Sequence, residues 1–207
     1  MRQRMVLLLA AIIVGIMVTY SRNEEYHAEN VQERIAEEVL RFHVLANSDS
    51  AKDQELKLKV KDAVVDYLAP YLEKDEMTLE EAKAEVTRRK EEVLEVARMV
   101  IAGEGYDYPV TAELTKDYFP VKVYGDVTLP AGEYEAFRIR IGDAEGKNWW
   151  CILYPPLCFV DVTYGYVPEG SKKQLKNVLD KDCYDAVMGG GKVEVRSRFL
   201  DWFRELL

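Results

Sequence analysis

Hydrophobic residues recur at helical spacing in two adjacent stretches of this chain. In the first, Leu56, Val60, Val64 and Leu68 fall on one face, which predicts a helix over residues 52–72. In the second, the sequence Thr-Leu-Glu-Glu at 78–81 is a capping box, and the apolar pattern that follows it runs to Gly103. Since about five residues join the two helices, we expect them to pack antiparallel.

Alternating hydrophobic and polar residues surround this helical pair and predict strands. One strand precedes the helices and the others follow them, at residues 40–46, 110–114, 121–124, 137–141 and 149–154. Both faces of the last strand are apolar, which indicates a central strand covered on both sides, and a glycine-containing loop joins it to the previous strand as a predicted hairpin. The order predicts an α+β fold: a mostly antiparallel sheet with a packed antiparallel helical hairpin.

The two ends of the chain differ in composition from this core. Arg2 and Arg4 precede the uncharged segment Met5–Tyr20, which is the pattern of a signal peptide or signal anchor, and whether it is cleaved stays open. The flanking arginines favour export of the body. The predicted organisation is a signal segment (1–21), a linker or short helix (22–38), an α+β core domain (39–166), a flexible spacer (167–191) and a short amphipathic C-terminal helix (192–207).

Charge and composition exclude several kinds of partner. The net charge is −9, and because Arg2 and Arg4 are the only charged residues among the first 21, the remainder carries −11. Such an acidic body repels phosphate backbones, so we expect no nucleic-acid partner. The chain holds three cysteines and two histidines without a C-x-x-C spacing, so neither a metal site nor a cofactor is predicted.

Three groups of residues could in principle carry chemistry. His43 is followed by Asn47, Ser48, Asp49 and Ser50, which suggests a Ser-His-Asp arrangement. Short oxygen-bearing side chains before a helix are typical of an N-cap, so we predict a structural role for the residues from Asn47 to Ser50.

Cys151 and Cys158 flank the Pro-Pro pair, and the sequence leaves open whether they are buried thiols or a disulfide. Glu133 and Glu135 lie on one face of a strand and are expected to be solvated. No catalytic residue is predicted.

Aromatic residues and prolines are concentrated at two places that suit protein–protein contact. One is the end of the last predicted strand, and the other is the apolar face of the C-terminal helix. The predicted partner-binding residues are Trp149, Trp150, Pro155, Pro156, Phe159, Phe199, Trp202 and Phe203.

Three separated motifs carry a resemblance to a known family. They are Asn148–Phe159, Pro130–Ala136, and Leu45–Ser50 followed by Asp53 and Gln54. Together they resemble the stage II sporulation protein R family over residues 40–160.

The resemblance implies a non-enzymatic signalling protein of endospore formation, exported across the forespore membrane into the intermembrane space or anchored facing it. It also implies a partner, the membrane-embedded aspartic protease that processes pro-sigma-E. Transient membrane association through the N-terminal segment is compatible with this role. The alternatives are a cell-envelope hydrolase and a membrane-anchored structural protein.

Overall fold

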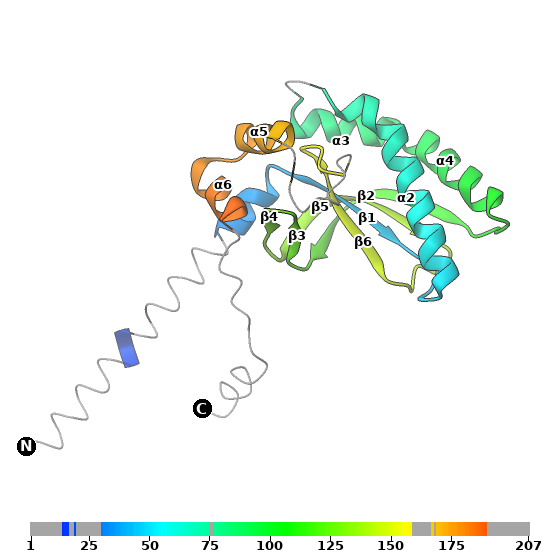
Figure 1. The fold of residues 1–207 in the computed structure, drawn as a ribbon, viewed down its shortest axis with the longest axis horizontal. Helices are drawn as coiled ribbons and strands as arrows, with labels where there is room; N and C mark the ends of the chain where they lie inside the picture. The colour runs from blue at the N-terminus through cyan, green and yellow to red at the C-terminus, as the bar shows by residue number, and fades with distance from the viewer. Residues whose placement is uncertain are drawn as a thin grey trace, which may run out of the picture.

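A mixed four-stranded sheet forms the centre of the molecule (Figure 1). The computed structural model describes residues 14–16, 19, 30–74, 77–158, 167 and 169–189. The strands, in their order across the sheet, are β2 (Val110–Phe119), β5 (Gly132–Ile141), β1 (Leu40–Leu45) and β6 (Asn148–Tyr154). Strands β1 and β5 are parallel, whereas the other two pairs are antiparallel. The predicted α+β class with a mostly antiparallel sheet is confirmed.

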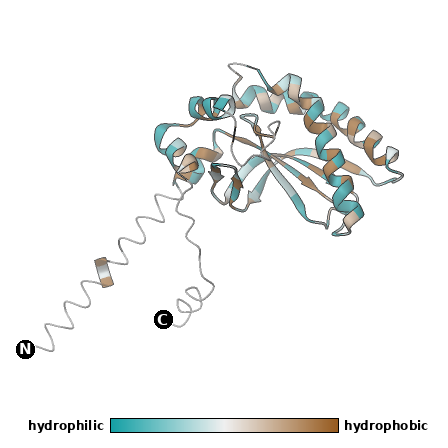
Figure 2. Cartoon of the chain, in the orientation of Figure 1, coloured by the Kyte–Doolittle hydropathy of each residue, from teal (hydrophilic) through white to brown (hydrophobic). Residues whose placement is uncertain are grey.

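Three helices cover one face of the sheet, and their apolar sides turn toward it (Figures 1 and 2). They are α2 (Ala51–Leu72), α3 (Leu79–Arg88) and α4 (Lys90–Gly103). The helix predicted over 79–103 is therefore two helices, divided at Arg89, where φ is −94° and ψ is 10°. Lys59 near the start of α2 pairs with Glu104 just after α4, and Arg89 reaches Tyr71 near the end of α2. These contacts establish the antiparallel arrangement.

The opposite face of the sheet contacts a short hairpin and helices from both ends of the folded body. The short hairpin β3 (Lys122–Tyr124) and β4 (Val127–Leu129) lies there with α5 (Glu169–Val178), α6 (Lys181–Met188) and the helical residues 30–36. Together with one end of this sheet face they form a second core, which takes in Phe119, Tyr134, Ala136 and Ile152. Farther along the same face Glu113 and Arg140 are exposed.

Helices α5 and α6 correct the expectation of a flexible spacer over residues 167–191, for the part that the structure describes. Leu175, Leu179, Cys183 and Val187 follow one another at intervals of four residues, and all are buried in the second core. Few large apolar residues occur in this stretch, but those present all lie on the buried side. The folded body thus extends past the predicted boundary at residue 166.

Strand β1 also corrects two expectations about β6. It lies between β5 and β6, so the two do not form the predicted hairpin, and β6 is at the edge of the sheet order rather than at its centre. Its apolar pattern has another cause: Ile152 belongs to the second core and Leu153 to the first, so both faces of this edge strand are covered.

The predicted signal segment lies almost wholly outside the described residues. Among the residues that the structure does describe, no helix combines the length and the apolar character that crossing a bilayer requires.

Candidate functional site

The residues Asn47–Ser50 join the end of β1 to the start of α2. Ser50 is the N-cap of α2, and its hydroxyl accepts a hydrogen bond from the backbone N–H of Asp53 at 3.1 Å. The buried Asp53 carboxylate accepts hydrogen bonds from the Ser48 hydroxyl and from Asn47 Nδ2, the latter at 3.0 Å. These bonds, with that from Ser48 the strongest influence, lower the pKa of Asp53.

The same four residues also hold the loop between β5 and β6. Asn47 Oδ1 accepts from the backbone N–H of Asp143 at 3.0 Å, and Asp49 Oδ1 accepts from that of Lys147 at 2.6 Å. Gly142 has a φ of +59°, and a Cβ there would lie 2.1 Å from Asn47 Oδ1, so both backbone conformation and space require glycine. These side chains therefore act together as a structural clamp.

Trp149 and Trp150 project to opposite faces at the start of β6, and both are half-buried. Trp149 packs edge-on against Phe42 with 6.0 Å between ring centroids, and Lys61 Nζ lies 4.9 Å from its ring centroid. Trp150 stacks on His43 with 3.8 Å between centroids and meets Phe119 at 4.6 Å. The exposed parts of the two indoles frame the sheet edge at β6.

The other predicted contact residues have different positions. Pro155 and Pro156 are buried in a turn in which the N–H groups of Leu157 and Cys158 both donate to Ile152 O at 3.1 Å. The prolines thus shape the end of β6 and present little surface. Phe159, Phe199, Trp202 and Phe203 lie outside the described residues.

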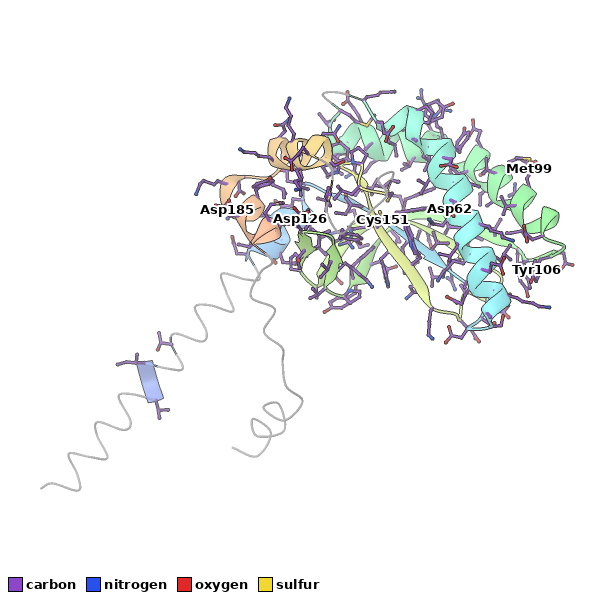
Figure 3. The ribbon with its side chains drawn as sticks, in the orientation of Figure 1. Asp62, Met99, Tyr106, Asp126, Cys151 and Asp185 are labelled. Atoms are coloured by element: carbon purple, nitrogen blue, oxygen red, sulfur yellow. The ribbon has the colours of Figure 1, made fainter. Side chains whose placement is uncertain are left out.

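All three cysteines are free thiols in the structure. Cys151 lies in the middle of the molecule (Figure 3), and Cys158 Sγ donates to Ile152 O at 2.9 Å. Burial, followed by a hydrogen bond with Cys151, raises the pKa of Cys158 well above its usual value, and burial raises that of Cys183 to about 11. Because nucleophilic thiols need the thiolate form, these environments oppose thiol catalysis. A Cys151–Cys158 disulfide stays a prediction.

His43 has a partner that the sequence did not indicate. Its Nδ1 lies 2.8 Å from Asp117 Oδ2 on β2, and Arg138 on β5 joins Asp117 at 3.0 Å and Glu113 at 2.7 Å. The His43 side chain is almost fully buried beneath Trp150, and this burial lowers its pKa against the opposing effect of the Asp117 hydrogen bond. A substrate would have to displace Trp150 to reach the imidazole, so the arrangement favours a structural role.

Arg41 on β1 is completely buried. As with His43, the alternation of apolar and polar residues along β1 did not indicate this burial. Its guanidinium donates to Cys151 O at 3.0 Å and to the Tyr124 hydroxyl at 3.1 Å, and lies 4.2 Å from the Phe119 ring centroid. Within the described part of the chain, its Nη1 has no hydrogen-bond partner. Arg41 thus anchors the β3–β4 hairpin to the sheet through Tyr124.

Among the described residues, no group of three or more histidine, cysteine, aspartate or glutamate side chains is placed so that it could hold a metal ion.

Comparison with known proteins gives two matches. The family model described as Stage II sporulation protein R matches residues 36–164. The stage II sporulation protein R of Bacillus subtilis (strain 168) is 37% identical over 180 residues, which cover 84% of this chain and 79% of the relative. No solved structure matches.

Proposed function

Because the chain belongs to the stage II sporulation protein R family and so has a role in sporulation, we propose that it is an exported signalling protein. In this role it activates, by direct contact, the membrane-embedded aspartic protease that processes pro-sigma-E. Family membership is the observation that carries the proposal.

Action by contact rather than by catalysis agrees with the chemistry of the described residues. The pKa values of Cys158 and Cys183 are raised, which disfavours their thiolate forms. His43, the residue best suited to act as a base, is buried beneath Trp150 and hydrogen-bonded to Asp117. Activation of the protease then requires that the protein bind its active form more tightly than its inactive form.

The sheet edge at β6 is the surface that we propose for this contact. Trp149 and Trp150 flank it from its two faces, and half-buried tryptophans are frequent hot spots in protein interfaces because they bury much area at little entropic cost. Lys61 and Lys122 lie beside the two indoles, 4.9 Å and 5.7 Å from the ring centroids. The surface therefore combines aromatic area with two lysines, of which Lys61 is paired with Asp62.

Export places this surface opposite the protease in the proposed scheme. The N-terminal signal segment directs the body across the forespore membrane into the intermembrane space, where the protein is either released or stays anchored. Phe199, Trp202 and Phe203 supply a second contact in the same proposal.

Reconstitution in a non-sporulating host tests the function. The host would carry the protease and pro-sigma-E, with this chain produced either whole or without residues 2–21. Cleavage of pro-sigma-E only with the exported chain is the expected result. Absence of cleavage with folded, exported protein would refute the proposal and favour the hydrolase alternative.

Variants in the same host test the contact surface. We expect Trp149→Ala and Trp150→Ala each to reduce precursor cleavage by about tenfold or more, as loss of a hot-spot residue does. Met99→Ala is the matched control, because Met99 is an exposed apolar side chain on α4 (Figure 3). Thermal unfolding verifies that each variant is folded, and normal cleavage with both tryptophan variants would place the contact elsewhere.

A further inference from the structure

Strand β2 is a long edge strand with exposed apolar side chains. In the described part of the chain its only strand neighbour is β5, with which it pairs along its whole length without a bulge. Leu114 is 39% exposed and Tyr118 62% exposed, and both point to the face that the helices only partly cover. Natural edge strands are shortened, bulged, covered or given charged side chains, because their free backbone groups can pair with another strand. Strand β2 is long and has no bulge, and its charged residues are Glu113, Lys116 and Asp117.

Exposed apolar residues of the folded body are also concentrated near this edge. Six large hydrophobic side chains of residues 30–189, as far as these are described, are exposed, and four of them lie between residues 114 and 123. They are Leu114, Tyr118, Val121 and Val123. Two of these side chains lie on β2 itself and two in or next to β3, which follows it, so exposed apolar side chains accompany the free edge.

We propose that β2 pairs antiparallel with β2 of a second copy of this chain, so that the two sheets continue into one across a two-fold axis. The two-fold axis must be perpendicular to the sheet, because only then do the helix-covered faces of the two copies lie on the same side of the joined sheet. Residues that lie directly opposite each other then point to the same face, and the axis passes through a residue of β2.

The charges on β2, together with the length of strand that is paired, select one register among those available. An axis at Glu113 places that carboxylate opposite its own copy, and an axis at Lys116 does the same for the ammonium group. An axis at Thr115 places Glu113 opposite Asp117 twice. Each of these arrangements opposes like charges, which destabilises a strand pair.

An axis at Leu114 avoids every such conflict. On the helix-covered face it places Leu114 opposite its own copy and Val110 opposite Tyr118, and Lys116 lies opposite the small Ala112. On the other face Glu113 lies opposite Thr115, and Thr111 lies opposite Asp117. This register also pairs all of β2 except Phe119. Axes at Leu114 and Thr115 give equally long overlaps, and of these two only the axis at Leu114 keeps like charges from lying directly opposite each other.

Sedimentation equilibrium of the full chain in a nonionic detergent tests the dimer. We expect a reversible monomer–dimer equilibrium that responds to charge at position 115, because each change acts twice in the dimer. Thr115→Glu opposes Glu113 and should raise the dimer Kd about fivefold, whereas Thr115→Lys should lower it by a similar factor. A monomer at all concentrations, or equal effects of the two substitutions, would overturn the proposal.

Cysteine cross-linking of the same chain tests the register. Leu114→Cys places two thiols opposite each other, so oxidation with copper–phenanthroline should yield a covalent dimer on a non-reducing gel. Tyr118→Cys is the matched control, on the same face of the same strand, and should stay monomeric because Tyr118 faces Val110. The unsubstituted chain shows the background from its buried thiols. Cross-linking of both variants or of neither would overturn the register, and association with other envelope proteins alone would assign the edge to a different partner.

Discussion

The clamp around Asp53 yields the sharpest stability prediction. Asp53 is 5% exposed, and its carboxylate accepts from Asn47 Nδ2 and from the Ser48 hydroxyl. Asp53→Ala removes both bonds and leaves two donors without their partner. Hydrogen bonds to a charged group contribute about 1.5–3 kcal/mol each, so the expected loss in free energy of unfolding is about 3–6 kcal/mol. Against a typical total of about 5–15 kcal/mol, this is a large fraction.

Urea unfolding followed by tryptophan fluorescence measures this loss. Glu55→Ala is the control, because Glu55 lies on the same helix, is largely exposed and makes only a surface pair with Lys59 at 3.0 Å. Such a pair contributes about 0.3–0.5 kcal/mol. A loss below about 1 kcal/mol for Asp53→Ala would refute the structural account of the Asn47–Ser50 segment. In the reconstituted host, Asp53→Ala that remains folded at low temperature should still support cleavage of pro-sigma-E.

Three further predictions concern pH and the second core. Hydrogen bonds from Arg88, the larger influence, and from Arg89 lower the pKa of Glu85 to about 2. The Glu85 carboxylate therefore stabilises the fold fully at pH values above the ordinary glutamate pKa of 4.5, and this stabilisation is lost as the pH falls toward 2. Glu85→Gln should therefore lower stability by about 1–2 kcal/mol at neutral pH and flatten that acid dependence in urea titrations, and an unchanged acid slope would contradict this. Burial holds the pKa of His43 below its ordinary value of 6.5, so the unfolded chain takes up the proton first and stability should decline as the pH drops below about 6.5. His43→Gln should remove this decline, as seen in melting temperatures between pH 5 and 8, and a decline that persists would assign it to another group. Leu175→Ala should cost about 2–4 kcal/mol in urea unfolding because Leu175 is fully buried, whereas a true spacer would show no more effect than the exposed control Lys173→Ala.

Much of the fold was predictable from local patterns. The spacing of Leu56, Val60, Val64 and Leu68 predicted α2, and all four are buried against the sheet. The capping box at Thr78 and Glu81 is formed in the structure, with both reciprocal hydrogen bonds present. Such features depend on residues within one or two turns of each other, so a sequence suffices to find them.

The candidate site was less predictable, because its groups meet across the sheet. His43 and Asp117 are 74 residues apart, and only the strand order, which places β5 between β1 and β2, brings them together. Burial of Arg41 likewise depends on distant segments, because Tyr124 of the β3–β4 hairpin and Phe119 at the end of β2 both contact its guanidinium. Ser50 caps α2, as local sequence can indicate, whereas the bonds from Asn47 and Asp49 to the loop at 142–147 could not be seen from the residues alone.

The sequence by itself determined α2, the capped start of α3, the main strands, the acidic character of the body and the motifs that place the chain in its family. Only the tertiary structure decided that β1 separates β5 from β6, that Pro155 and Pro156 are buried, and that α5 and α6 complete a second core. The physical reason is one of range. Periodicity and capping act between neighbours in the chain, whereas strand order and the burial of a face follow from the total apolar area that distant segments remove from water together.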